Sequence, residues 1–196
     1  MSALKDKFLT ICRQRIKRSG IDDLLAWLEK SDFFTAPAST KYHGAYPGGL
    51  LQHSLNVYAE IHRIKSAYPN IEVPDESLAI VSLFHDLCKV NFYATETRNR
   101  KNTDGQWESY EYYTINEKFN YGGHGSKSVY LIQNFMKLTP EEAVAVNCHM
   151  GAFDNDQYIG KSFEQFPLAW FLHVADCSAA FIVEPKQEAQ EIHQGG

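Results

Sequence analysis

The sequence predicts an all-α protein, a helical bundle of one domain that carries a small β-hairpin insertion. Apolar residues recur at helical spacing along most of the chain, and its 196 residues are a natural length for a single domain. One segment, about residues 91–119, departs from this pattern and is rich in aromatic and Thr residues, as paired strands are. Hydrophobic residues make up 44% and charged residues 22%, which excludes a disordered or fibrous chain.

Each predicted helix has its own signal in the sequence. Gly20 separates two short amphipathic helices, and Pro and Gly residues between positions 37 and 49 predict an irregular connection before the third helix. Asp75 and Glu76 open the fourth helix, where acids favour the positive end of the helix dipole. Pro140 suits the first turn of a later helix. The predicted helices are 2–18, 21–30, 50–65, 75–84, 126–138, 140–148 and 164–183.

Two of these segments stand out. Residues 78–84 are apolar around almost the whole circumference of a helix, which indicates a helix in the middle of the core. Residues 92–97 and 107–115 have the composition of strands, and the turn residues from Asn102 to Gly105 lie between them. The single domain is therefore divided into N-terminal helices (1–39), a helical core (40–183) and a C-terminal tail (184–196).

Composition also excludes several classes of protein. The four cysteines form no Cys-x-x-Cys pair, so we expect reduced thiols and no structural zinc knuckle. No apolar run reaches the roughly 20 residues of a membrane span, and we expect a cytoplasmic protein with no membrane partner. The net charge of −5 argues against nucleic-acid binding through bulk electrostatics. The basic segment 1–20 is interpreted as a solvated helix face.

The ionisable residues of the apolar helices are the candidate site. His53 lies in an apolar stripe, where a single histidine is more often a satisfied core residue than a ligand. His85 and Asp86 directly follow the most apolar helix, so a buried carboxylate is expected there, and Lys89 could neutralise it as a helix neighbour. Asp176 lies in an apolar run, residues 168–182, that contains no other acid and no Lys or Arg.

A divalent cation would account for all four residues. Two carboxylates in a shared core would repel each other, and a bound cation removes both that repulsion and the cost of burying each charge. With His53 and His85, the aspartates form a mixed nitrogen and oxygen ligand set suited to Mn, Fe, Co, Ni or Zn. The other histidines are weaker candidates: His173 is assigned to core packing or support of a ligand, and His43, His62 and His193 to surface or local structural roles.

The order of these motifs resembles the HD-domain metal-dependent phosphohydrolase superfamily. Residues 48–54 look like the first ligand helix of that family, and residues 85–89 look like its His-Asp-x-Gly-Lys signature, with Cys88 where Gly is usual. The resemblance covers about residues 40–183 and implies that His53, His85, Asp86 and Asp176 hold one metal. In the binuclear branch two further histidines hold a second metal, and His124 and His149 occupy the matching places.

The resemblance implies a phosphomonoesterase or phosphodiesterase that uses one or two divalent ions (Mn, Fe, Ni, Co, Zn or Mg). Asp86 and Lys89 are the expected catalytic residues. Lys89 and three hairpin residues, Arg98, Arg100 and Lys101, are expected to bind the substrate, a small phosphoester such as a nucleotide or short oligonucleotide. A nucleic acid is a possible partner but is not favoured.

Other interpretations remain open at this point. The hairpin could instead be a solvated element whose aromatic side chains cover the core. A di-iron oxygenase with the same six ligands and a non-catalytic binding module are the alternative functions, and the sequence does not fix the oligomeric state.

Overall fold

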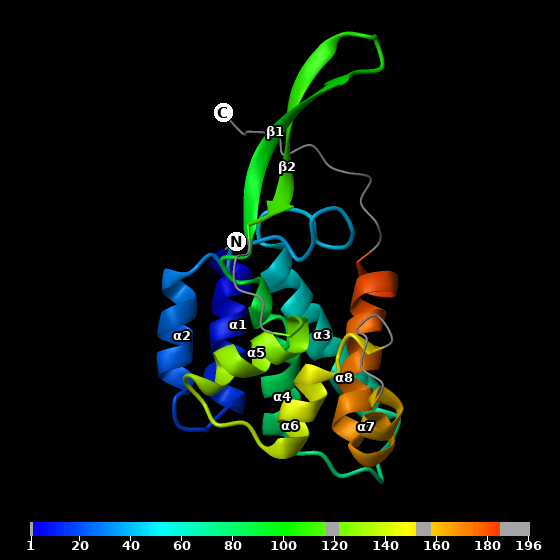
Figure 1. Ribbon diagram of the computed structural model, residues 1–196. Helices are drawn as coiled ribbons and strands as arrows, with labels where there is room; N and C mark the ends of the chain where they lie inside the picture. Colours follow the sequence, from blue (N-terminus) through cyan, green and yellow to red (C-terminus); the bar gives the residue numbers. More distant parts are fainter. Residues whose placement is uncertain (1, 117–121, 152–157, 185–196) are drawn as a thin grey trace.

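The computed structural model describes residues 2–116, 122–151 and 158–184. In these described residues, eight α-helices form the body of the protein. A two-stranded antiparallel sheet projects from this body, as Figure 1 shows. The mostly helical fold with one hairpin is therefore confirmed. The elements are α1 Ser2–Arg15, α2 Ile21–Lys30, α3 Gly49–Ser66, α4 Asp75–Phe84, the 3-10 turn η1 Leu87–Lys89, β1 Tyr93–Lys101, β2 Trp107–Ile115, α5 His124–Gln133, α6 Pro140–Asn147, α7 Ile159–Gln165, α8 Pro167–Ser178 and the π-helix η3 Ala179–Val183.

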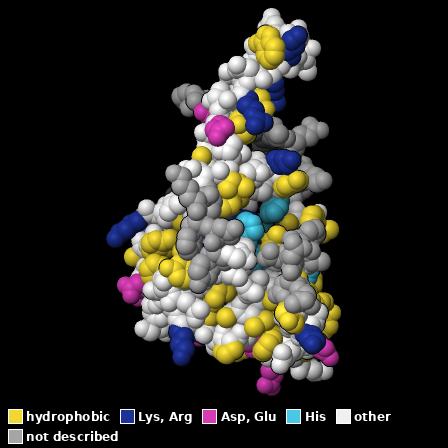
Figure 2. Space-filling view, in the orientation of Figure 1, with side chains coloured by type: hydrophobic (Ala, Val, Ile, Leu, Met, Phe, Trp, Pro, Cys, Tyr) yellow, Lys and Arg dark blue, Asp and Glu magenta, His cyan; other side chains and the backbone are white. Residues whose placement is uncertain are grey.

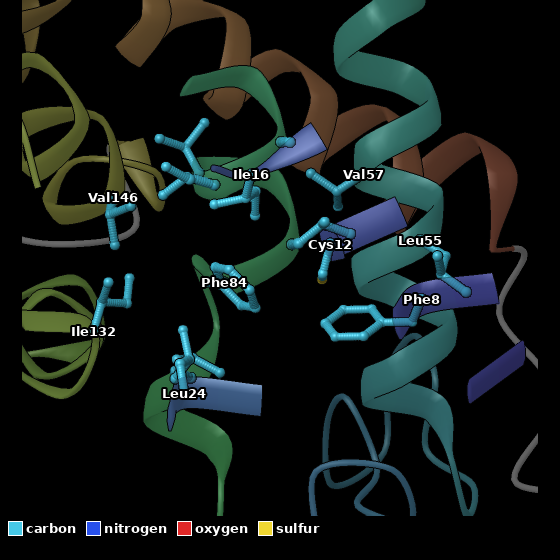
Figure 3. Packing of buried hydrophobic residues seen from close by; sticks show 14 of the residues in the cluster. Phe8, Cys12, Ile16, Leu24, Leu55, Val57, Phe84, Ile132 and Val146 are labelled. Carbon is cyan, nitrogen blue, oxygen red and sulfur yellow. The ribbon is translucent and has the colours of Figure 1, made fainter. Parts of the chain in front are cut away.

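Helix α4 lies at the centre of the body. Every residue from Ser77 to Phe84 is buried, as the apolar run predicts, and α4 contacts α1, α3, α6 and α8. The ring of Phe84 lies 6.0 Å from that of Phe8 on α1, edge to face, and Figure 3 shows both in the core. Because α4 is enclosed on all sides, the residues that directly follow it also begin inside the protein.

The prediction of one continuous helix over residues 164–183 is wrong, because the structure divides this segment between α7 and α8. Helix α7 ends at Gln165 and α8 starts at Pro167, with a bend of 115° between them. Phe166 is extended, with φ −126° and ψ 92°, since a proline disfavours the α conformation in the residue before it. Among the described residues no single helix has the length and hydropathy of a membrane span, although this bent pair meets both conditions when taken together.

The hairpin has the register that its turn dictates. Tyr93 pairs with Ile115 at its base and Lys101 with Trp107 near its tip. The side chain of Asn102 accepts hydrogen bonds from the backbone N–H groups of Asp104 and Gln106 at 3.0 and 2.9 Å, which closes the turn. Most of the hairpin residues remain partly or fully exposed, so its shape depends on cross-strand pairs more than on a core.

The basic N-terminal segment is not wholly a solvated face, because Arg18 turns inward. Helix α1 ends at Arg15, and the Arg18 guanidinium donates hydrogen bonds to both carboxylate oxygens of Glu142, whose side chain is fully buried. Glu142 also accepts from Ser77 Oγ at 2.7 Å and from the backbone N–H of Thr139 at 2.8 Å, completing the capping box of α6. This ion pair links the N-terminal segment to the start of α6.

Replacing Arg18 with Ala should therefore lower the free energy of unfolding by about 3 kcal/mol, because it leaves a buried carboxylate without its cation. Urea denaturation measures this loss. Arg15→Ala is the control, since the Arg15–Asp75 pair is exposed and 4.0 Å long, and it should change stability by less than about 0.5 kcal/mol. Equal effects of the two changes would contradict the role given to Arg18.

The same pair predicts a pH dependence. Burial alone would raise the pKa of Glu142, but the hydrogen bonds from Arg18, Thr139 and Ser77 outweigh it and hold the pKa below the ordinary 4.5. A depressed pKa gives stability that is present above pH 4.5 and is lost as the pH falls through the lower value of the folded state. In Arg18→Ala this acid-sensitive part of the unfolding free energy should be smaller.

Candidate metal centre

Four helices place their polar residues at one end of the bundle. His53 comes from α3, His85 and Asp86 follow α4, His149 follows α6, and Asp176 lies on α8. The two histidines 53 and 85 have no exposed surface, and Asp86 and His149 are almost as deeply buried. The structure thus brings together the four residues predicted for the first metal, and His149 as well.

The donor atoms of these side chains lie within a few ångströms of one another. His53 Nε2 is 3.1 Å from Asp176 Oδ1 and 3.6 Å from Asp86 Oδ2. The Nε2 atoms of His53 and His85 are 3.3 Å apart, and His149 Nε2 is 3.6 Å from Asp86 Oδ1. Three sets of donors among the described residues are compact enough to share an ion, and two of them contain the predicted ligands: His53 with His85 and Asp86, and His85 with His149 and Asp176.

A break after α4 lets two consecutive residues face the same centre. Helix α4 ends at Phe84, and Asp86 leaves the helical conformation with φ −103° and ψ 22° before η1 begins. The turn is held by the backbone N–H of Cys88, which donates to Ser128 Oγ on α5 at 3.0 Å. In a continued helix, neighbouring side chains would point about 100° apart, so this break is what brings the His85 and Asp86 side chains into one cluster.

Hydrogen bonds at Nδ1 fix which nitrogen of each histidine faces the centre. Nδ1 of His85 lies 2.9 Å from the carbonyl oxygen of Ser82, and Nδ1 of His149 lies 2.7 Å from that of Val146. A carbonyl only accepts, so each Nδ1 carries a proton and a neutral ring presents the lone pair of Nε2. His149 Nε2 is buried and has no hydrogen-bond partner among the described residues. Such inward-facing lone pairs are the donors that a metal ion takes.

The charges of the centre do not balance among the described residues. Asp86, Asp176 and Glu184 have side chains 4, 15 and 8% exposed, and one ammonium group, that of Lys89, lies against them. Lys89 Nζ is 2.6 Å from Asp86 Oδ2, so the helix-neighbour pair considered for Asp86 does form. It leaves two carboxylates whose charge must be met by protonated histidines or by a divalent cation.

The pKa directions describe the protein without an ion. Burial alone would lower the pKa of His53, but its hydrogen bonds to Asp176 and Glu184 outweigh burial and raise it to about 10. Burial lowers the pKa of His85 to about 4, so this ring stays neutral. Burial would raise the pKa of Asp86, yet the Lys89 ammonium holds it well below its ordinary value. The ionised Asp86 and the neutral His85 have the protonation states that metal ligation requires, whereas the pKa values of His53 and His149 are raised, so a divalent ion bound there would displace protons.

The second histidine predicted for the binuclear site lies at the edge of the cluster. His124 begins α5, and its Nδ1 is 3.5 Å from the sulfur of Cys88. His124 belongs to none of the compact donor sets within the described residues, so its role as a ligand stays a prediction. Gly125 packs against the backbone of Asn147 at the end of α6, where a Cβ atom would clash with the Asn147 carbonyl. This close approach sets the distance between His124 and the segment that carries His149.

Two residues of the centre were not predicted from the sequence. Glu184, assigned to the C-terminal tail, lies 3.1 Å from Nδ1 of His53 through Oε1. His43, assigned to a surface or local structural role, has its ring 4.8 Å from that of His53. One signal could have revealed Glu184: it is the first charged residue after Asp176, at the end of the same apolar run. His173 donates from Nδ1 to the carbonyl oxygen of His149 at 2.8 Å and so holds the backbone of that candidate ligand.

A pocket of about 570 Å³ opens beside these residues, within the size range of small-molecule sites. Figure 2 shows histidine side chains reaching the surface at the foot of the hairpin. The pocket is lined by Tyr42, His43, Asp86, Lys89, His124, His149, Met150, Asp176, Cys177, Ala180 and Phe181.

The three predicted hairpin ligands do not line this pocket. Arg98 lies over the ring of Tyr112 at 4.1 Å, Arg100 over Tyr110 at 4.9 Å, and Lys101 over Trp107 at 5.7 Å. Arg100 also pairs with Glu108 at 2.7 Å. Their contacts are with the opposite strand of the hairpin, and whether they bind substrate stays a prediction.

Comparison of the chain with protein-family models, with curated proteins and with solved structures finds no match. The geometry by itself defines a helical protein with a buried His and Asp cluster that could bind a metal ion.

A divalent ion should therefore stabilise the folded protein. Mn²⁺ at 100 times its dissociation constant should raise the free energy of unfolding by about 2.7 kcal/mol, and chelation should reverse the gain. Asp176→Asn should abolish it, because the change removes a ligand charge. The measurement is thermal or urea denaturation with and without Mn²⁺, and the control is Asp75→Asn on the exposed start of α4. Equal stabilisation of both variants would place the ion elsewhere.

Proposed function

We propose that the protein is a metal-dependent phosphohydrolase of the HD-domain type. The observation that carries the proposal is the convergence of His53, His85, Asp86 and Asp176, in the chain order of that superfamily, beside a pocket that also holds Lys89. Apart from His85 and Asp86, these four residues are far apart in the sequence. Their convergence is therefore a property of the fold, as a ligand set requires.

Each of these residues has a role in the proposed mechanism. One ion would be held by His53, His85, Asp86 and Asp176, and a second ion would be held by His149 and His124. A bound divalent ion lowers the pKa of its water towards ~7 and neutralises charge on phosphoryl oxygens. Burial alone would lower the pKa of Lys89, but Asp86 raises it above its ordinary value. Lys89 therefore stays protonated at neutral pH and supplies a positive donor to a phosphoryl group in the pocket.

Two variants separate metal binding from catalysis. Asp86→Ala should lose both the bound ion and metal-stimulated phosphate release, because it removes a carboxylate at the centre of the cluster. Lys89→Met should retain the ion but lower kcat about 10²-fold, the typical loss of one donor that stabilises the transition state. Metal content by elemental analysis and phosphate release from a panel of nucleotides and oligonucleotides measure the two effects.

The result that contradicts the proposal is a folded, metal-loaded protein with no activity on any phosphoester of the panel. Two bound irons with consumption of O₂ would indicate the oxygenase chemistry instead. Asp75→Asn serves as a control for both variants, since Asp75 lies on the exposed start of α4 and should leave metal content and activity unchanged.

The length of the hairpin bears on the substrate. Tyr93, at its base, hydrogen-bonds the carbonyl oxygen of Ala38, and the Lys89 ammonium acts on its pKa, so the strand starts beside the pocket. At a rise of about 3.3 Å per residue, Arg98 lies about 17 Å further along the strand. One nucleotide bound at the centre is too short to reach it. A role for Arg98 in binding would therefore require an oligonucleotide, the longer of the two expected substrates.

The register decides which hairpin residues could act together. Arg98 pairs with Tyr110 and Arg100 with Glu108, so Arg98 and Arg100 share one face with Tyr110 and Tyr112. Lys101 and Trp107 pair on the opposite face. Aromatic rings beside guanidinium groups are typical of surfaces that bind single-stranded nucleic acid through stacking and phosphate contacts. The face of Arg98 and Arg100 is thus the better candidate for an extended substrate.

Arg98→Ala should raise KM for a single-stranded oligonucleotide about fivefold, equal to about 1 kcal/mol, and leave KM for a mononucleotide unchanged. Thr97→Ala is the matched control, because Thr97 belongs to the same strand but faces the other side. Steady-state kinetics on both substrates measure the difference. An equal effect of Arg98→Ala on the two substrates, or none on either, would remove the hairpin from substrate binding.

A further inference from the structure

Glu184 contacts the candidate metal centre from behind one of its ligands. Its carboxylate is 3.1 Å through Oε1 and 3.3 Å through Oε2 from Nδ1 of His53, the ring nitrogen that points away from Asp86 and Asp176. The His53 side chain has no exposed surface and that of Glu184 is 8% exposed. The two nitrogens of His53 therefore face two different carboxylate environments, with Glu184 on one side and the cluster on the other.

A second hydrogen bond fixes the carboxylate in this position. Asn56 Nδ2 donates to Glu184 Oε1 at 2.8 Å, and Gln52 Nε2 donates to Asn56 Oδ1 at 2.8 Å. Gln52 and Asn56 are one turn apart on α3, the helix that also carries His53. Helix α3 thus provides both the imidazole and the amide groups that orient the acceptor of its proton.

The π-helix η3 explains how Glu184 reaches α3. Asp176 and Glu184 are eight residues apart, so in an unbroken α-helix their side chains would differ by about 80° around the axis. The backbone N–H of Glu184 instead bonds the carbonyl oxygen of Ala179 at 2.8 Å, an i→i+5 bond. A π-turn takes in one residue more than an α-turn, which rotates Glu184 back by roughly that angle, onto the side of Asp176. Both acids then point towards His53.

We propose that Glu184 is a positioning residue, one that holds His53 in the tautomer and orientation with which Nε2 binds the metal. A carboxylate that accepts the Nδ1 proton of a ligating histidine keeps the lone pair on Nε2 and increases its basicity. The inference rests on the metal centre of the proposed function, and it assigns a role to a residue outside the ligand set.

Direct ligation by Glu184 is the competing role. Donor atoms of His43, His53 and Glu184 lie within 4.8 Å of one another, so these three could hold an ion of their own. The observed contacts favour positioning, because Oε1 already accepts from Asn56 and the same carboxylate lies within hydrogen-bond distance of His53 Nδ1. Ligation of an additional ion would require His53 to give up the Nδ1 proton.

The test compares Glu184→Gln and Glu184→Ala with the wild-type protein, each titrated with Mn²⁺ and with Co²⁺. Loss of the acceptor in the Ala variant should weaken binding about 10- to 100-fold without changing the number of ions bound. The Gln variant retains an acceptor oxygen and should recover part of the affinity. With Zn²⁺ bound, a diamagnetic ion, ¹H–¹⁵N NMR should show a slowly exchanging Nδ1 proton on His53 in the wild type and a faster-exchanging one in the Ala variant.

Glu60→Gln is the matched control for a purely structural effect. Glu60 also joins α3 to the end of α8, since it accepts a hydrogen bond from Ser178 Oγ at 2.5 Å, but its hydrogen bonds run to Arg63 and Ser178 and not to His53. Glu60→Gln should leave metal affinity within about twofold of the wild type.

Three results would overturn the proposal. If Glu184→Ala binds Mn²⁺ and Co²⁺ as tightly as the wild type, Glu184 does not position His53. If it loses one whole equivalent of ion, Glu184 is a ligand. If the wild-type protein itself binds neither ion, the proposed function fails and this inference fails with it.

Discussion

The burial of three carboxylates and three imidazoles at one end of a helical bundle is the constraint on which the rest depends. Asp86, Asp176 and Glu184 lie where ionised groups are costly, and one lysine among the described residues contacts them. Backbone carbonyls hold the Nδ1 protons of His85 and His149, so their lone pairs must face inward. The fold can tolerate this arrangement only if protons or a cation supply positive charge.

The burial of helix α4 determines where the residues of this arrangement lie. Since its residues from Ser77 to Phe84 are all buried, the residues that directly follow it start inside the protein and find most of their polar partners there. Asp86 is satisfied twice, by the ammonium group of Lys89 at 2.6 Å and by the surrounding histidines. An ion pair and a candidate ligand cluster are therefore compatible at the same carboxylate, although the sequence presents them as alternatives.

Features that depend on local composition could be predicted, and features that depend on distant partners could not. The apolar run identifies α4, and isolated acids and histidines in apolar helices identify His53, His85, Asp86 and Asp176. Glu184 was missed because a π-turn, which leaves no clear pattern in the sequence, rotates it into the site. The inward position of Arg18 was missed because its partner, Glu142, lies 124 residues away. The sequence does not predict the bend before α8, because the apolar pattern continues across Pro167.

The contact between Gly125 and Asn147 has a consequence for how the centre could change over evolutionary time. Helices α5 and α6 touch there backbone to backbone. The distance between the elements that bear His124 and His149 is therefore set by the absence of a side chain at Gly125. Any larger residue would wedge the two helices apart. A mutation of this kind would alter the separation of two imidazoles while leaving both in the sequence, and a homologue could thus lose a two-ion site without losing a single ligand.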